Sequence, residues 1–378
     1  MKKLKNPPSL NEYFGELRDV KGIFDGRKAF IGPELVQVDL TNVCDNQCLG
    51  CWLHGKELKD KKFRKEAIDI KVLKRLLHEL KRLGVKRINL SGGGEPYCYP
   101  DIDDAIELIK KLGFHLNINT SFSMMTKDRV EALVYNKVDY ITLSVWSTDA
   151  QSYVKQHPNK TEKDFNSLKE NLIHLLKIKH EKPKINFYNV INRYNFTEIK
   201  DMVRFAESFK AEGVGFNLVD VKKGKTDHLK LGPDEKKIVL DSIIRAQKEN
   251  RIRKGPKINI FGAEEFMEKN IDAERMVNSI PCYMGWIFCR IFPNGNVGVC
   301  CKSYKFVMGN INDKEFRKIW FSKRYDEFRR KALKMNKEDI YFKNLGCVKS
   351  CDNFTQNKET VERLQRLNIF DKIKLLFV

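Results

Sequence analysis

The sequence lacks any run of about 18 apolar residues, the length from which a membrane-spanning helix would be suspected. Its first eight residues lead into polar chain rather than into the apolar core of a signal peptide. Low-complexity segments and long internal repeats are also missing. The length of 378 residues and the 42 % hydrophobic content exclude a disordered tail, a collagen-like fibre and a small disulfide scaffold, and the missing apolar segments predict a cytoplasmic protein.

Acidic residues are outnumbered by basic ones: the sequence has 71 lysines and arginines but 50 aspartates and glutamates, which gives a formal net charge of +21. The basic residues are scattered along amphipathic segments, as in Lys74-Arg75 and Lys86-Arg87, without an RNA-binding module. We therefore expect no specific nucleic-acid partner, and either a solvated basic surface or an anionic small-molecule substrate. The last residues, 373–378, are expected to pack onto the protein, with contact to a membrane surface as the alternative.

Short β-rich runs alternate with helical ones, which predicts an α/β fold. Strands are expected at residues 35–40, 87–90, 114–119, 140–144, 185–190 and 214–219. Helices are expected at 72–83, 102–112, 127–135 and 163–178, and from a capping box at Asn195 and Glu198 to Phe209. Six alternations predict a partial (β/α)6 barrel with its chemistry at the carboxyl edge of the strands.

The 378 residues are enough for one large domain and a smaller one. The expected segments are an N-terminal extension, the barrel, a helical linker, a cysteine-rich module and a C-terminal helix, at 1–34, 35–230, 231–281, 282–352 and 353–378. Within the last segment, the helix is expected to start near Thr360. Within the cysteine-rich module, Pro-Asn-Gly-Asn between two short apolar runs at 291–299 predicts a β-hairpin.

Nine of the ten cysteines form two groups, and in a reducing compartment such groups are more often metal ligands or catalytic thiols than disulfides. The first group is Cys44, Cys48 and Cys51, directly after the first expected strand. Three thiolates at this spacing can bind three irons of a [4Fe–4S] cluster and leave the fourth iron open to a non-protein ligand. Zinc is the alternative, although zinc loops usually pair their ligands two and two.

A glycine motif, Ser91-Gly92-Gly93-Gly94-Glu95-Pro96, ends the second expected strand. Glycines there let the backbone approach a ligand, with N–H and C=O groups available for an ammonium or a carboxylate. The cysteine and glycine motifs, in this order, resemble the radical S-adenosylmethionine (radical SAM) superfamily over about residues 35–220.

That resemblance implies that the open iron binds S-adenosylmethionine. One electron from a donor such as flavodoxin or ferredoxin would then yield methionine and a 5′-deoxyadenosyl radical, which abstracts a hydrogen atom from the substrate. By position, the resemblance assigns cofactor contacts to Gly92, Gly93, Gly94, Glu95, Ser144, Asn192 and Asn195. In the family the residue before the third cysteine is usually aromatic. Here it is Gly50, and Trp52 is the nearest replacement.

The second cysteine group resembles the SPASM and twitch modules of the same superfamily, which hold auxiliary [4Fe–4S] clusters. The additional Cys-x2-Cys pair of a complete SPASM module is missing, so the resemblance implies one auxiliary cluster. Its expected ligands are Cys282, Cys300, Cys347 and Cys351. Cys289 and Cys301 are alternate ligands or buried thiols, and a structural zinc is the alternative for the module.

Two further features could act on a substrate. Cys98 is expected either to donate a hydrogen atom to a substrate radical or to be a packed thiol. Residues 153–160, with His157 and Lys160, are expected as a loop that holds a sugar or a phosphate, or that only leads into a helix.

Together these features predict a radical SAM oxidoreductase that oxidises a polar small molecule, carbohydrate-like or anionic, with the auxiliary cluster as electron acceptor. An aminocyclitol dehydrogenase shares this layout. Sugar epimerisation with Cys98 is one alternative. Peptide modification is another, although the 34 residues before the first strand are too few for the leader-peptide domain of many such enzymes. A non-catalytic iron–sulfur electron-transfer protein is the third, and it would have no use for the glycine motif.

Overall fold

The computed structural model describes residues 20–51, 53–55, 63–260, 280–336, 339–345, 347 and 351–367. Several expectations therefore lie wholly or partly outside the described residues: the N-terminal extension, Trp52, the second half of the linker and the C-terminal end with its possible membrane contact. Among the helices that are described, none combines the length and the apolar character needed to cross a membrane.

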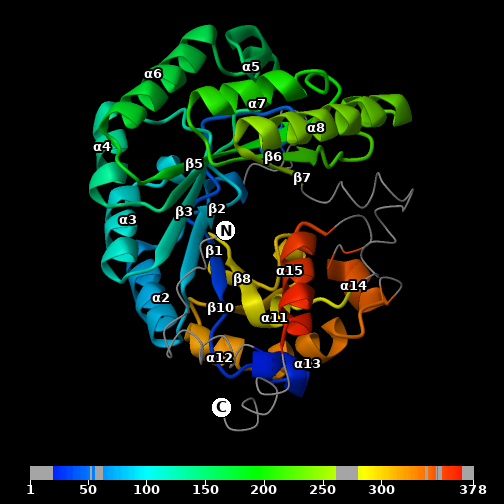
Figure 1. Ribbon diagram of the computed structural model, residues 1–378. Coiled ribbons are helices and arrows are strands. Elements are labelled where there is room, and N and C mark those ends of the chain that lie inside the picture. Colours follow the sequence, from blue (N-terminus) through cyan, green and yellow to red (C-terminus); the bar gives the residue numbers. More distant parts are fainter. Residues whose placement is uncertain are drawn as a thin grey trace.

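A single sheet of ten strands organises the described chain, in the order β10-β9-β8-β1-β2-β3-β4-β5-β6-β7 (Figure 1). Its strands are β1 (Leu35–Asp39), β2 (Arg87–Ser91), β3 (His115–Thr120), β4 (Tyr140–Leu143), β5 (Lys184–Ile191), β6 (Gly213–Leu218), β7 (Lys257–Ile260), β8 (Phe288–Ile291), β9 (Asn296–Gly298) and β10 (Val307–Asn310). All neighbouring pairs from β8 to β7 are parallel, and only β8–β9 and β9–β10 are antiparallel. The expected α/β fold with successive strand–helix units is confirmed.

Helices line the outer side of this sheet (Figure 1). Those of the first two-thirds of the chain are α2 (Ile70–Arg82), α3 (Ile102–Lys111), α4 (Lys127–Tyr135), α5 (Ala150–Gln156), α6 (Glu162–Ile178), α7 (Ile199–Ser208) and α8 (Pro233–Arg253). Alternate strand residues such as Ile88, Leu116 and Ile141 are buried in the core, whereas their neighbours are only half-buried. The period of two thus separates an apolar outer face from a polar inner face.

The C-terminal region extends the sheet rather than standing apart from it. The predicted hairpin is confirmed as β8 and β9, and β8 pairs with β1, so Val36 lies opposite Cys289. The region also contains α11 (Met284–Ile287), α12 (Phe316–Trp320), α13 (Lys323–Ala332), α14 (Ile340–Leu345) and α15 (Phe354–Gln365). The buried indoles of Trp286 and Trp320 donate their N–H groups to the carbonyls of Lys28 and Ile31, which ties this region to the segment before β1.

Three expectations about local structure are wrong. The capping box at Asn195 and Glu198 does not form: α7 begins at Ile199, and the Asn195 side chain instead accepts a hydrogen bond from the Asn192 N–H. Part of the expected loop 153–160 is helix α5, which Asp149 caps by accepting from the Ser152 N–H. The final helix begins at Phe354 rather than near Thr360.

A buried ion triad supports the end of the sheet opposite the strands' carboxyl edge. Asp139, which precedes β4, accepts hydrogen bonds from Lys110 and Lys182 and from the Leu116 N–H. Burial alone would raise the pKa of Asp139, but these donors outweigh it and lower the pKa to about 2. The triad therefore stabilises the folded state above the pKa of an unfolded aspartate, about 3.9, and this contribution is lost as pH falls toward 2.

Asp139→Asn is expected to lower the free energy of unfolding at pH 7 by about 1–2 kcal/mol, because Lys182 is half-exposed and solvent screens part of its attraction. The difference from the wild type should shrink below about pH 4, where the carboxylate begins to take up its proton. Urea unfolding at several pH values measures both effects. Glu131→Gln, in an exposed pair with His174, is the matched control. An equal loss in that variant, or a difference that does not change with pH, would contradict the assignment.

Candidate functional site

The loop after β1 carries Cys44, Cys48 and Cys51, all partly buried. Burial raises the pKa of Cys44 and of Cys48, and the charges of the neighbouring thiolates raise the pKa of Cys48 further. Three such thiols become thiolates together only when positive charge is bound between them. The loop therefore fits a metal cluster, and the three cysteines remain its predicted ligands.

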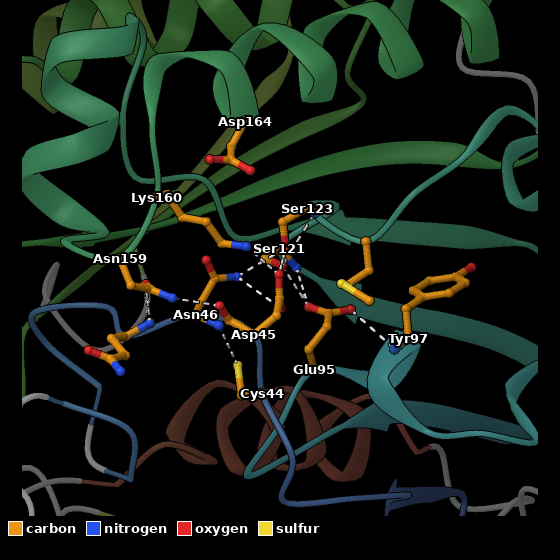
Figure 2. Close-up of polar contacts among 12 residues, drawn as sticks. Cys44, Asp45, Asn46, Glu95, Tyr97, Ser121, Ser123, Asn159, Lys160 and Asp164 are labelled. Carbon is orange, nitrogen blue, oxygen red and sulfur yellow. Dashed lines mark hydrogen bonds and ion pairs between the residues drawn. The ribbon is translucent and has the colours of Figure 1, made fainter.

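Asp45 secures this loop to the other side of the site (Figure 2). Its carboxylate accepts hydrogen bonds from Ser123 Oγ (2.7 Å) and from Lys160 Nζ. Asn159 adds two bonds: its amide donates to the Asp45 carbonyl (2.7 Å) and accepts from the Gln47 N–H (2.7 Å). Lys160 therefore anchors the cysteine loop. Whether residues 157–160 also hold a sugar or a phosphate stays a prediction.

The glycine motif packs directly against the chain that leads into the cysteine loop. Gly94 and Glu95 donate their N–H groups to the carbonyls of Thr41 (3.1 Å) and Val43 (2.9 Å). A Cβ on Gly94 would lie 2.1 Å from the Val43 carbonyl oxygen, so only glycine permits this approach. The two motifs thus form one unit at the carboxyl edge of β1 and β2.

Glu95 is buried and its carboxylate is fully engaged within the protein (Figure 2). It accepts from Thr120 Oγ1 (2.6 Å), from the N–H and hydroxyl of Ser121 (2.7 and 2.8 Å) and from the Tyr97 N–H (3.3 Å). Burial raises the pKa of Glu95, and the hydrogen bonds from Thr120 and Ser121 offset only part of that rise. The side chain fixes the glycine motif to the end of β3. The Glu95 N–H and carbonyl are bonded to Val43 and Cys98, and its contact with a cofactor stays a prediction.

The other predicted cofactor residues lie at the same edge of the sheet. Ser144 follows β4 and donates its N–H to the Thr120 carbonyl (2.9 Å). Asn192 and Asn195 are fully buried after β5. Asn195 donates to the carbonyls of Trp146 and Val190. The Asn192 side-chain amide donates to Gln156 Oε1 (2.7 Å), and its Oδ1 accepts from the Tyr194 N–H. Both asparagines hold the chain after β5 in place, and their contact with a cofactor stays a prediction.

Cys98 is half-buried next to the cysteine loop. Burial, together with the charges of Asp45 and Glu95, raises the pKa of the Cys98 thiol to about 11. The thiol therefore keeps its proton near neutral pH, as a hydrogen-atom donor must. Its position is compatible with the predicted role but does not assign it.

Four members of the second cysteine group line a cavity in the C-terminal region. The four expected ligands, Cys282, Cys300, Cys347 and Cys351, are all in its wall. The remaining wall is mostly apolar, from residues such as Met284, Phe328 and Phe342. Burial, together with the charge of another cysteine of the group, raises the pKa of each of the four thiols to about 12. Chain segments far apart in the sequence thus bring four thiols around one space.

The spread of these thiols bears on the choice between a cluster and zinc. In the part of the chain that the structure describes, no three histidine, cysteine or acidic side chains converge as ligands of one metal ion. A zinc ion bonds all of its thiolates directly, with zinc–sulfur distances of about 2.3 Å. In a [4Fe–4S] cluster each thiolate bonds a different iron. Cysteine thiolates serve either group, so the cluster stays the prediction and zinc the alternative.

The two alternate cysteines lie elsewhere. Cys289 is fully buried in β8, within the main apolar core, and does not line the cavity. Cys301 turns toward the barrel, where its thiol donates a long hydrogen bond to Gln37 Oε1 (3.8 Å). The sequence analysis gives these two only as alternate ligands or buried thiols, and the choice of the four cavity cysteines as the ligands stays a prediction.

A buried ion pair, missed by sequence reasoning, lies between the two cysteine sites. Arg290 in β8 donates to Asp39 Oδ2 at the end of β1 (2.9 and 2.6 Å) and also to the Cys301 carbonyl. Both side chains are at most 6 % exposed, so water cannot replace either partner of the ion pair. Asp39 also lies under the glycine motif, where a Cβ on Gly92 would be 2.3 Å from Asp39 Cγ.

The inner face of the sheet carries a ladder of neutral polar side chains. Asn117 in β3 is its centre: its amide donates to Asn89 Oδ1 and Asn119 Oδ1 (both 2.7 Å), and its oxygen accepts from Thr142 Oγ1 (3.0 Å). Further along the sheet, Asn217 donates to the Tyr188 hydroxyl (3.0 Å). These half-buried groups offer both donors and acceptors to a polar, uncharged ligand.

Comparison with known proteins identifies the same two parts. Residues 38–206 match the model of the radical SAM superfamily, and residues 282–353 match the SPASM iron–sulfur cluster-binding domain. The first match implies S-adenosylmethionine and a [4Fe–4S] cluster, and the second implies auxiliary iron–sulfur clusters, as the sequence analysis predicts. The number of auxiliary clusters stays a prediction.

Individual relatives cover different shares of the chain. An S-adenosylmethionine-dependent nucleotide dehydratase from Thermoplasmatales archaeon (strain ISO4-H5) is 32 % identical over 39 % of this chain and 51 % of its own length. A PqqA peptide cyclase from Gluconobacter oxydans is 23 % identical over 76 % of each protein. The structure of Streptococcus suis SuiB bound to S-adenosylmethionine superposes with a TM-score of 0.66 at 19 % identity, covering 86 % of this chain and 75 % of SuiB. This likeness establishes a shared fold.

Cys282→Ala or Cys347→Ala, in anaerobically reconstituted full-length protein, is expected to lower the iron content from about eight to about four atoms, because each removes one ligand of the auxiliary cluster. Cys289→Ala is the matched control, since that thiol is buried but outside the cavity. Iron and acid-labile sulfide analysis measures the result. Full iron in Cys282→Ala, or lost iron in Cys289→Ala, would contradict the ligand set.

Proposed function

Because the chain belongs to the radical SAM superfamily and carries a SPASM domain, we propose that it is an enzyme that abstracts a hydrogen atom from a polar substrate and oxidises it. When bound, the cluster and S-adenosylmethionine supply the 5′-deoxyadenosyl radical, and an auxiliary cluster supplies an electron acceptor. The observation that carries this proposal is the presence of two separate groups of partly buried thiols, one in the loop after β1 and one in the region that contains β8, the neighbour of β1 in the sheet.

Each part of the chain has a defined task in this proposal. Cys44, Cys48 and Cys51 hold the cluster that binds the cofactor, and the Asp45–Lys160 pair keeps their loop in place. The glycine motif, fixed by Glu95, presents backbone groups to the methionine part of the cofactor. The four cavity cysteines hold the auxiliary cluster. An electron donor such as flavodoxin or ferredoxin must supply the electron for cofactor cleavage.

The inner face of the sheet supports a substrate whose reacting part is polar and uncharged. A peptide backbone is our first choice, since its amides match the amide groups of Asn89, Asn117 and Asn119. The similarity to a peptide cyclase over three-quarters of the chain favours the same choice. A carbohydrate-like or nucleotide-linked substrate offers hydroxyl groups to the same ladder. It remains the second candidate, with the partial similarity to a nucleotide dehydratase in its favour.

Cys44→Ala is expected to abolish the formation of 5′-deoxyadenosine by the reduced enzyme, because the loop then offers only two of its three ligands. About half of the iron should remain, in the auxiliary cluster. Chromatography of the reaction mixture and iron analysis measure the two results, with Cys289→Ala as the control. Formation of 5′-deoxyadenosine at the wild-type rate by Cys44→Ala would refute the proposed function.

Asn117→Leu is expected to lower substrate-dependent 5′-deoxyadenosine formation by about ten-fold or more, since it removes the centre of the ladder and leaves Asn89 and Thr142 unpaired. Slow cleavage of S-adenosylmethionine without substrate should be unchanged. Peptides and nucleotide sugars are tested in parallel, and a two-electron oxidation removes two hydrogens from the product mass. A product that instead gains one solvent hydrogen without net oxidation, and that Cys98→Ala abolishes, would support epimerisation. Equal loss with and without substrate would contradict the role of the ladder.

A further inference from the structure

Helix α5 packs against the cysteine loop and presents several buried polar atoms there. The Leu49 N–H donates to the Gln156 carbonyl (3.0 Å), which fixes the loop to the end of the helix. Tyr153 and Gln156 lie about one helical turn apart, and each exposes at most 1 % of its surface. The phenol of Tyr153 lies near Cys48: burial raises the pKa of Tyr153, and the charge of the Cys48 thiolate raises it further.

Polar atoms in this region are left without partners. Among the residues that the structure describes, the Tyr153 hydroxyl, the Gln156 amide nitrogen and the Trp146 indole nitrogen make no hydrogen bond. Each is a donor, and each is shielded from water. An unpaired buried donor is costly, and a protein rarely leaves several together unless a bound group completes them.

The backbone around these donors is shaped for close approach to the cysteine loop. Trp146 has a φ of +61°, an uncommon conformation for a bulky residue. Its indole lies 3.7 Å from the point where a Cβ on Gly50 would be, between Cys48 and Cys51. That Cβ would also come within 2.9 Å of a Val219 methyl group, so glycine at position 50 lets Val219 pack closely, with the indole at ordinary contact distance.

His157 does not compete for these donors. Its Nδ1 lies 3.0 Å from the Tyr153 carbonyl, which requires that Nδ1 carries the proton. Its ring stacks on Tyr153 with centroids 4.3 Å apart, so it packs on the face of the phenol. Burial lowers the pKa of His157 to about 4, and the ring is therefore neutral near pH 7. His157 is therefore uncharged beside Tyr153, and Tyr153 and Gln156 offer the loop neutral donors.

We propose that Tyr153 and Gln156 donate hydrogen bonds to the sulfur atoms of the cluster at Cys48 and thereby raise its reduction potential. This inference rests on the proposed function, since it requires a cluster on Cys44, Cys48 and Cys51. A reduced cluster carries one more negative charge than the oxidised one, so donors to its sulfur atoms stabilise the reduced form more. Tyr153 and Gln156 are positioning residues that make the cluster easier to reduce.

Redox titration of the anaerobically reconstituted full-length protein tests this inference, and the spectroscopic signal of the reduced cluster is its readout. Only a cluster with an open iron responds to added S-adenosylmethionine, which distinguishes its signal from that of the auxiliary cluster. In Tyr153→Phe the potential should shift to more negative values. At a fixed applied potential the ratio of reduced to oxidised cluster should fall by about five-fold or more. Gln156→Met should shift the potential in the same direction.

Tyr97→Phe is the matched control. The Tyr97 hydroxyl is equally buried and also without a partner among the described residues, but its ring points away from Cys44 (Figure 2) and lies 5.4 Å from the Arg129 guanidinium. Its removal should leave the potential unchanged. Unchanged potential in iron-loaded Tyr153→Phe and Gln156→Met, or weaker binding of S-adenosylmethionine without a shift in potential, would overturn the inference. Failure of the wild type to load iron at the cysteine loop would instead refute the proposed function.

Discussion

The buried ion pair between Asp39 and Arg290 joins the two halves of the site. It connects the last residue of β1 to β8, strands that are neighbours in the sheet but 251 residues apart in the sequence. Two charges without access to water stay folded together only if their mutual hydrogen bonds are well made. Because Arg290 also donates to the Cys301 carbonyl, beside Cys300, the pair links the glycine motif to the wall of the auxiliary cavity.

Both cysteine sites share one electrostatic constraint. Burial raises the pKa of Cys44 and Cys48 in the first group and of the four cavity thiols in the second, and neighbouring thiolates add to the rise, so neither group ionises readily on its own. A bound cluster supplies the compensating positive charge, and its binding energy then contributes to folding. At the auxiliary cavity, Lys302 adds a positive charge between Asp220 and Asp352. Cluster loading and the stability of the C-terminal region are therefore coupled.

Much of the fold followed from local patterns. Strands β1 to β6 and most helices lie where hydrophobic periodicity predicts them, because that periodicity records which face of each element is buried. The failed predictions have a common cause, which is that contacts with distant segments decided the local structure. Asn195 matched a capping box, but its side chain completes the turn after β5 instead. Residues 150–156 form a helix that lacks a long amphipathic repeat and is held by Asp149 and by its contact with the cysteine loop.

The sequence by itself determined the family, the order of the motifs and the residues able to bind iron, since ligand chemistry depends on residue type and short spacing. Only the tertiary structure decided how these parts are held. Lys160 reaches Asp45 across 115 residues, and Val219 packs into the space that Gly50 leaves. The structure also placed Cys300 in the cavity wall and turned Cys301 toward Gln37. Such contacts depend on how strands distant in the sequence pack, and no local pattern records that.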